Sequence, residues 1–130
     1  ILKDGDGINS PIYSYKTHKR LSKNNRINVC DILIVDGIYV LLKKNIRKLF
    51  DLAIFLDVKT EVRKHRRISR DIIERSRTKN EVENRFEKMI IPMHKKFVET
   101  TKKCADLIIK KDYSFKSIAS RVEVLINEVY

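Results

Sequence analysis

The sequence predicts an α/β domain in which a parallel sheet is flanked by helices and preceded by a β-hairpin. Three short apolar runs, at residues 31–37, 51–57 and 105–110, are continuous rather than alternating, which is typical of strands covered on both faces. Helical patterns lie between and after these runs. The resulting order of strands and helices implies right-handed crossovers and a parallel sheet.

The helices are predicted from the spacing of apolar side chains. Residues 41–50 form a short helical pattern, a longer one starts at Thr60, and a last one covers residues 115–129. Apolar or weakly polar residues recur at helical spacing after Thr60, which predicts that helix. These residues are Val62, His65, Ile68, Ser69 and Ile72.

A further helix is predicted to begin at Thr78. Thr78 and Glu81 have the Thr-x-x-Glu spacing of a capping box. Val82 and Phe86 are among the apolar residues that recur on one side of this helix. Pro92 lacks a backbone donor, so we expect it to kink or break the helix.

The first 30 residues have a different pattern. Two segments of alternating polarity flank the sequence SKNNR, residues 22–26. Alternating segments around a polar stretch predict a β-hairpin, which we describe as a flap, with its turn at residues 22–26.

The chain is long enough for one domain or part of one, and it is strongly basic. Its 130 residues include 29 Lys and Arg against 17 Asp and Glu, for a formal net charge of +12. An excess of this size favours anionic partners such as phosphates, nucleotides or nucleic acid. An AT-rich genome, which enriches Lys, Asn and Ile, is the alternative explanation.

Features of membrane and secreted proteins are missing from the sequence. No apolar run approaches the ~20 residues of a membrane span, and the N-terminus lacks the pattern of a signal peptide. The chain does not begin with Met, so we expect it to be an excerpt of a longer protein. Cys30 and Cys104 predict neither a disulfide framework nor a metal site, and a reducing cytoplasm is the expected location.

An acidic residue and a glycine, Asp36 and Gly37, end the first apolar run. Ligands of parallel α/β proteins bind at the carboxyl ends of strands. A carboxylate there can hold Mg²⁺ directly or through water, and glycine allows a tight turn. The alternative is an ordinary Asp-Gly turn.

Arginines are concentrated in residues 66–77, in a protein that otherwise favours Lys. Helical spacing is expected to align Arg63, Arg66, Arg70 and Arg77 on one face. A surface lattice of salt bridges is the commoner cause of such a run. The choice of Arg favours a phosphate clamp, because guanidinium grips phosphate oxygens in a fixed fork.

Aromatic residues and a histidine gather in the N-terminal segment. Tyr13 and Tyr15 are expected on the same side of a strand, close to His18. They can flank a planar base, or they can pack the flap onto the core.

These segments together resemble the uridine kinase family. SPIYSYKTHKR, ILIVDGIYVL, IRKLFDLAIFLDV, RRISRDIIERSR and KKFVETTKKCADLII occur in the order and at the intervals of that family. The resemblance covers nearly the whole chain and corresponds to the last two thirds of such a kinase. It implies a partial P-loop kinase with a flap at residues 1–30, an α/β part at residues 31–130 and a lid at about residues 66–80. Phosphoribulokinases have a similar but looser pattern.

The resemblance implies a function in pyrimidine salvage. Members of the family transfer a phosphoryl group from ATP or GTP, with Mg²⁺, to the 5′-hydroxyl of uridine or cytidine. By position, Tyr13 and His18 correspond to residues that recognise the pyrimidine, and Asp36 to a metal-associated carboxylate. The arginines implied around the nucleotide phosphates are Arg67, Arg70 and Arg75, of which Arg70 and Arg75 are the expected catalytic residues, and Arg77 is implied in nucleoside binding.

The sequence departs from the family pattern at several positions. Ser14 replaces an Asp, Thr100 replaces a Pro, and Ser76 replaces a glycine whose loss is expected to stiffen the lid. Arg85 stands where many members have a substrate-contacting glutamine, so it is a candidate for nucleoside binding that also puts nucleoside preference in question.

A phosphate-binding loop is absent from these residues. Its motif, G-x-x-x-x-G-K-[ST], cannot start at Gly5, Gly7 or Gly37, and the family's general base would lie upstream of Ile1. We therefore expect the chain by itself not to turn over ATP. The strand that leads into the loop would also be missing from the sheet, so we expect residues 31–36 and 52–57 to pair directly or a second copy to associate, and we expect a homo-oligomer.

Two other functions compete with the nucleoside kinase. A basic nucleic-acid-binding module would use the arginine helix to track phosphates. Interspersed acidic residues and the lack of an RNA-binding aromatic motif count against it. A phosphoribulokinase-like sugar-phosphate kinase is the other, and Tyr13 with His18 favours a pyrimidine instead.

Overall fold

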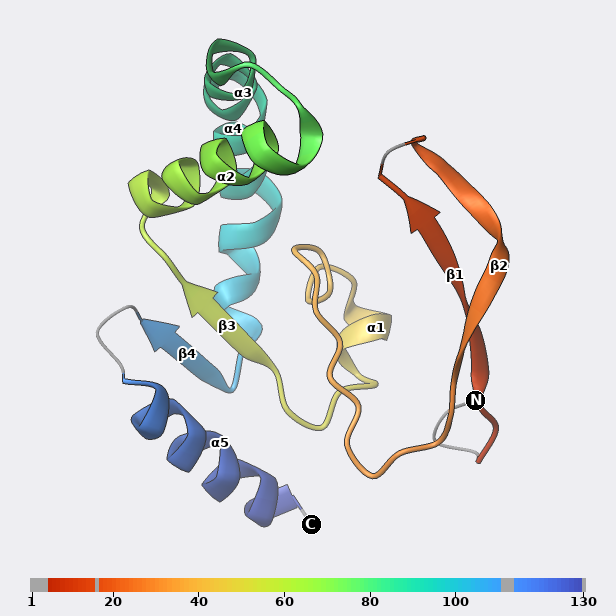
Figure 1. Cartoon of the computed structure of the whole chain (residues 1–130). Helices are drawn as coiled ribbons and strands as arrows, with labels where there is room; N and C mark the ends of the chain where they lie inside the picture. The colour runs from red at the N-terminus through yellow and green to blue at the C-terminus, as the bar shows by residue number, and fades with distance from the viewer. Residues whose placement is uncertain (1–4, 16, 111–113, 130) are drawn as a thin grey trace. The chain divides into compact units, whose positions relative to one another are not determined.

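The computed structural model describes residues 5–15, 17–110 and 114–129. The chain divides into two compact units, Ile1–Val35 and Asp36–Tyr130. The first contains an antiparallel pair of strands, and the second contains a parallel pair and the helices (Figure 1). The α/β class predicted from the sequence is therefore confirmed.

The N-terminal unit is built on a hairpin. Strand β1, Ile8–Ser14, pairs antiparallel with β2, Lys19–Ile27. The register is interrupted between Pro11 and Tyr13, where proline has no backbone donor for the ladder. Its role as a flap over a binding site remains a prediction.

The turn of the hairpin lies where the sequence did not predict it. Residues 22–26 belong to β2, and the chain reverses between Ser14 and Lys19 instead. The Ser14 hydroxyl accepts a hydrogen bond from the Thr17 backbone N–H at 3.2 Å, and His18 adopts a left-handed conformation with φ 53°. A serine hydroxyl that accepts a hydrogen bond from the backbone favours a turn at its own position. The asparagine-rich residues 22–26 favour a turn as well, and the structure has the turn that follows Ser14.

The prediction of a strand at residues 31–37 is wrong. The structure gives these residues no regular secondary structure, and their side chains are exposed, with Ile34 at 87%. The expected direct pairing with the second apolar run is also absent, because the described residues of that run pair only with a later strand. An apolar sequence without a hydrogen-bonded neighbour cannot form a sheet strand.

The sheet of the second unit consists of β3, Ile54–Asp57, and β4, Leu107–Lys110. The strands are parallel, with Phe55 opposite Ile108 and Asp57 opposite Lys110. The side chains of Phe55 in β3 and Ile109 in β4 are buried. The second and third predicted strands are thus confirmed, although each is shorter than predicted.

A short connection leads from Asp36 to the sheet. The backbone turns at Gly37, where an added Cβ would meet the Val40 side chain at 2.8 Å. Helix α1 covers only Lys44–Arg47, less than the predicted residues 41–50. Arg47 fixes the connection, since its Nη1 donates to the Leu41 carbonyl at 2.6 Å and to the Leu42 carbonyl at 3.1 Å.

Helix α2, Thr60–Arg75, follows β3 directly. The helix predicted from the spacing after Thr60 is confirmed. Of the residues that carry the spacing, Val62 and Ile68 are half-buried, whereas His65, Ser69 and Ile72 are exposed, and the fully buried residue is Asp71. The spacing did not identify Asp71 as buried, because an analysis of apolar spacing assigns a polar residue to the solvent.

A long helical run connects α2 to β4 and returns beside β3 (Figure 1). The capping box is confirmed: the Thr78 hydroxyl accepts from the Glu81 backbone N–H at 3.3 Å. Pro92 does not break the run, which continues through this residue between two wider π-helical turns. Val82 and Phe86 are buried as predicted. The run consists of α3, Lys79–Arg85, a π-turn at Phe86–Ile90, α4, Ile91–Met93, a π-turn at His94–Val98 and a 3₁₀ turn at Glu99–Cys104.

The last helix, α5, covers Phe115–Val129 as predicted. None of the helices formed by the described residues combines the length and apolar content that a bilayer crossing requires.

Candidate functional site

Three arginines converge on one buried carboxylate at the end of α2. Arg70 donates from Nε and Nη2 to Asp71 Oδ1, at 3.0 and 2.9 Å. Arg75 Nη1 lies 3.4 Å from the same oxygen, and Arg67 Nε lies 3.5 Å from Oδ2. We refer to these four residues as the Asp71 cluster.

The cluster has an inner and an outer layer. The Asp71 side chain is 1% exposed, whereas the side chains of Arg70 and Arg75 are 43% and 27% exposed. Solvent therefore reaches the guanidinium groups but not the carboxylate beneath them. An anion from solution would meet only the positive layer, which is an arrangement suited to phosphate oxygens.

The charges of the cluster reinforce this arrangement. Burial by itself raises the pKa of Asp71, but the hydrogen bonds from Arg70 and the charges of the three arginines hold the pKa below its ordinary value. Burial lowers the pKa of Arg67; the charge of Asp71 opposes this shift, and the charges of Arg70, Arg75 and Arg85 add to it. Arg85 from α3 is thus close enough to add to the field, and guanidinium groups outnumber the carboxylate.

The end of α2 is shaped by the same aspartate. The helix ends at Ser76, which has the left-handed angles φ 51° and ψ 35°. The backbone N–H groups of Ser76 and Arg77 both donate to the Asp71 carbonyl. Asp71 therefore fixes the backbone of the turn through its carbonyl and the arginines through its carboxylate.

The structure brings together only some of the residues singled out in the arginine stretch. Arg67, Arg70 and Arg75 meet, but Arg77 does not join the expected alignment with Arg63, Arg66 and Arg70. Arg63 Nε donates to the Val58 carbonyl at 3.0 Å and Nη2 to Thr60 Oγ1 at 3.0 Å, and Arg77 lies beyond the helix end.

Sequence reasoning missed Asp71 as the organising residue. The signal was present, since Asp71 lies four residues after Arg67 and four before Arg75, the spacing at which helical side chains meet. Periodicity of apolar residues alone does not detect a buried acid.

The other predicted site residues stand apart from this cluster. Asp36 is exposed and makes no hydrogen bond or ion pair among the described residues. Within those residues no three His, Cys, Asp or Glu side chains gather to hold a metal ion. A single carboxylate fits Mg²⁺ only as one ligand among phosphate oxygens and waters.

The hairpin carries the predicted base-recognition residues. The rings of Tyr13 and Tyr15 meet edge to face, with centroids 5.2 Å apart at 76°. Both side chains are exposed, and His18 lies exposed in the turn. The expectation that the two tyrosines share one side of the strand is confirmed; their partner remains a prediction.

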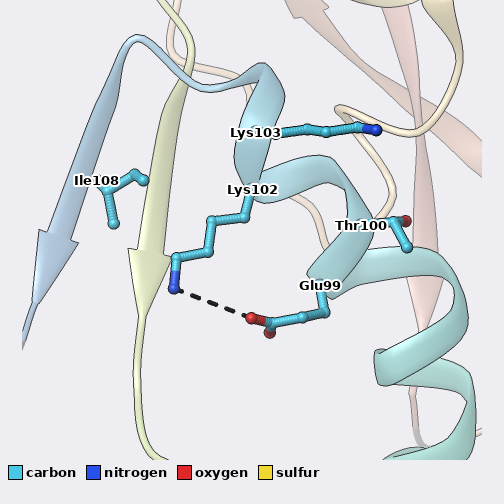
Figure 2. Close-up of a pocket in the computed structure, with 5 residues that line it drawn as sticks. All are labelled: Glu99, Thr100, Lys102, Lys103 and Ile108. Carbon is cyan, nitrogen blue, oxygen red and sulfur yellow. Dashed lines mark ion pairs between the residues drawn. The ribbon is translucent and has the colours of Figure 1, made fainter.

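A second polar cluster lies at the carboxyl end of β3. Lys102 Nζ lies 2.6 Å from Asp57 Oδ2 and 3.9 Å from Glu99 Oε1. Figure 2 shows the Lys102 and Glu99 side chains directed toward each other at a shallow hollow of about 380 Å³, with Lys103 pointing elsewhere. The hydrogen bond with Lys102 lowers the pKa of Asp57, and that with Asp57 raises the pKa of Lys102.

A histidine borders this second cluster. Burial, followed by the charge of Arg63, lowers the pKa of His94. His94 is therefore neutral at pH 7, and its 3.8 Å approach to Glu99 is not an ion pair there.

Comparisons with known proteins identify the family of the chain. A family model described as "Phosphoribulokinase / Uridine kinase family" matches residues 1–115. A protein named uridine kinase from Clostridium novyi (strain NT) is 44% identical over 108 residues, which make up 83% of this chain and 52% of that protein. One from Macrococcus caseolyticus (strain JCSC5402) is 41% identical over 108 residues, with the same coverage.

A third protein named uridine kinase, from Clostridium perfringens (strain 13 / Type A), is 38% identical over 128 residues, which make up 98% of this chain and 62% of that protein. The chain thus spans between 52% and 62% of the lengths of these three relatives.

Proposed function

The chain belongs to the phosphoribulokinase and uridine kinase family, and from this membership we propose that it forms the nucleotide-clamping part of a nucleoside kinase. The reaction is transfer of the terminal phosphoryl group of ATP or GTP to the 5′-hydroxyl of uridine or cytidine. Such an activity returns free pyrimidine nucleosides to the nucleotide pool. The observation that carries the proposal is the outward layer of guanidinium groups above Asp71.

The arginines supply the charge that phosphoryl transfer needs. Negative charge accumulates on the transferred group and its neighbours in the transition state, and catalysis consists mainly of positioning and charge stabilisation. Arg70 and Arg75 are the proposed catalytic residues, because they present N–H groups at the outer layer. Arg67, whose side chain is about as exposed as that of Arg75, binds the nucleotide phosphates together with them.

Nucleoside binding is assigned to residues of the hairpin and to two arginines of the second unit. Tyr13 offers an exposed aromatic face for stacking on a pyrimidine, and His18 offers ring nitrogens for hydrogen bonds. Arg77 and Arg85 are the further candidates for nucleoside binding. Asp36 would contribute one oxygen ligand to Mg²⁺, which shields phosphate charge when it is bound.

The 130 residues are proposed to be inactive by themselves. Phosphoryl transfer needs backbone N–H groups and a lysine around the phosphates, and no G-x-x-x-x-G-K-[ST] motif occurs among these residues. The chain should therefore bind ligands without turnover.

A binding experiment on the 130-residue chain tests the proposal. We expect ATP to perturb the NMR resonances of the Asp71 cluster and uridine to perturb those of Tyr13 and His18. Arg70→Ala should weaken ATP binding about tenfold, since a bidentate charged donor contributes roughly 1.5–3 kcal/mol. Arg66→Ala is the matched control, because Arg66 lies exposed on the same helix and carries the same charge.

The control variant should lose no more than about twofold in affinity, as expected for one screened surface charge. Equal losses for the two variants, or no response of the cluster to ATP, would contradict the proposal. Release of ADP in the presence of uridine would contradict the inactivity of the chain.

A sugar-phosphate kinase is the second candidate, because the matching family model includes phosphoribulokinases. Titration with ribulose 5-phosphate in place of uridine separates the two. Perturbation of Tyr13 and His18 by uridine alone favours the nucleoside kinase, and perturbation by the sugar phosphate alone favours the alternative.

A further inference from the structure

The Asp71 carboxylate is costly to bury as it stands. Its Oδ2 atom is buried without a hydrogen-bond partner among the described residues, with Arg67 Nε at the longer distance of 3.5 Å. A buried acceptor left unsatisfied destabilises the folded state, and a buried ion pair often contributes less than apolar packing would. Stability therefore does not account for an acid at this position.

The position of the Asp71 carboxylate also affects the direction of the arginine N–H groups. Asp71 occupies one edge of the Arg70 guanidinium through Nε and Nη2, which leaves Nη1 outside this contact. A guanidinium group is planar and rigid, so a contact along one edge sets the direction of the remaining N–H groups. Asp71 follows Arg70 directly and lies four residues from Arg67 and from Arg75, so a single carboxylate contacts all three.

Without the carboxylate the same side chains would separate. Guanidinium groups this close together repel one another, and each long side chain would regain rotamer freedom. A phosphate would then have to gather and order the arginines when it binds. A site that is ordered beforehand avoids this cost.

We propose that Asp71 is a positioning residue whose buried carboxylate holds Arg67, Arg70 and Arg75 in one group that is ready to bind a polyphosphate. The inference rests on the proposed function, since it explains how the phosphate-binding arginines of that site are held. Asp71 itself touches neither substrate nor nucleotide, because the arginines cover it.

The test uses a substitution for which positioning and net charge predict opposite changes in the affinity for an anion. Asp71→Asn keeps the shape of the side chain and removes one negative charge, so simple electrostatics predicts tighter binding of an anion. Positioning predicts weaker binding. The probe is inorganic tripolyphosphate, titrated calorimetrically into the 130-residue chain at pH 7 and low ionic strength.

The matched control is Glu74→Gln, which removes the same charge from an exposed residue of the same helix. We expect Asp71→Asn to lose about tenfold in affinity, equivalent to ~1.4 kcal/mol. Glu74→Gln should bind as well as the wild type or up to about twofold more tightly. Binding by Asp71→Asn that equals or exceeds that of Glu74→Gln would overturn the inference.

The wild type separates failure of this inference from failure of the proposed function. If the wild type does not bind tripolyphosphate, the proposed phosphate site is wrong and the inference falls with it. If the wild type binds and only the order of the two variants is reversed, the phosphate site stands and the role of Asp71 is refuted.

A spectroscopic measurement on the wild type decides the case in which Asp71→Asn does not fold. We expect the Arg70 Nε–H to exchange slowly with solvent both before and after saturation with tripolyphosphate, because the carboxylate keeps its edge of the guanidinium. The exposed Arg66 is the fast-exchanging reference. Exchange of Arg70 as fast as that of Arg66 in the saturated complex would mean that phosphate displaces Asp71, and would refute positioning.

Discussion

Residues 31–37 and residues 51–57 have similar sequences but different structures. DILIVDG and DLAIFLD each place apolar residues between two aspartates. The second contains β3, in which Phe55 is 8% exposed, whereas Ile34 in the first is 87% exposed. β3 has β4 as a hydrogen-bonded neighbour, and the first stretch has none among the described residues. The comparison teaches that an apolar run becomes a strand only where a partner satisfies its backbone.

The largest expected difference between the two stretches is in side-chain truncation. Phe55→Ala should destabilise the chain by about 3 kcal/mol, because it removes a buried aromatic side chain and leaves a cavity. Ile34→Ala should change the free energy of unfolding by less than about 0.5 kcal/mol, since Ile34 is exposed. Denaturant unfolding of both variants measures the difference. Equal losses would mean that residues 31–37 are packed in solution.

A smaller effect on stability is expected at Ser76, where the backbone conformation is unfavourable for a residue with a side chain. Ser76 ends α2 with φ 51°, a conformation that costs a residue with a side chain roughly 1–2 kcal/mol. Ser76→Gly should stabilise the chain by about 0.5–1 kcal/mol, since glycine avoids the strain but loses more backbone entropy on folding. Thermal unfolding checks this value. A loss of stability would show that the Ser76 hydroxyl, rather than its backbone, governs the turn.

The smallest expected effect concerns the aspartates that close the two stretches. Asp57 is paired with Lys102, which lowers the pKa of Asp57 in the folded state. The unfolded chain therefore binds the proton more readily. The stabilisation from Asp57 is present above about pH 4, near the ordinary pKa of the group, and is lost as pH falls through the folded pKa.

Asp57→Asn should accordingly lower the thermal midpoint at pH 7 by a few degrees at most and remove part of the acid dependence below about pH 4. Asp36→Asn is the control, because Asp36 has no such partner among the described residues. Thermal melts between pH 3 and pH 7 compare the two. An acid dependence that Asp57→Asn leaves unchanged would mean that the pair with Lys102 does not form in solution.

Local signals predicted the helical part of the fold well. The Thr78 capping box, the buried pair Val82 and Phe86 and the last helix depend on neighbours within a few turns, so the sequence is sufficient for them. The hairpin was predicted, but its turn was misplaced, because Ser14 and His18 supply a weaker signal than the asparagines of residues 22–26. Pro92 was predicted to kink or break its helix, and the helical run continues through it between two π-turns.

The candidate site was predicted in part. Arg67, Arg70 and Arg75 were singled out by resemblance, and the structure brings them together. The alignment expected from helical spacing failed for Arg77, because Arg77 follows the end of α2. Arg63 lies in α2 as expected, but its guanidinium donates to Val58 and Thr60 near the start of the helix. Buried charge could not be foreseen from periodicity, since a buried carboxylate such as Asp71 is tolerated only where charged partners surround it.

The sequence by itself determined the α/β class, the approximate positions of the helices, the excess of arginine over carboxylates in residues 66–77 and the membership of a kinase family. Those properties reside in short-range patterns and residue chemistry. Tertiary structure alone decided which apolar runs became strands and which face of α2 turned inward. Both depend on partners distant in the chain, because a backbone donor or a buried carboxylate is stable only where another segment supplies its counterpart.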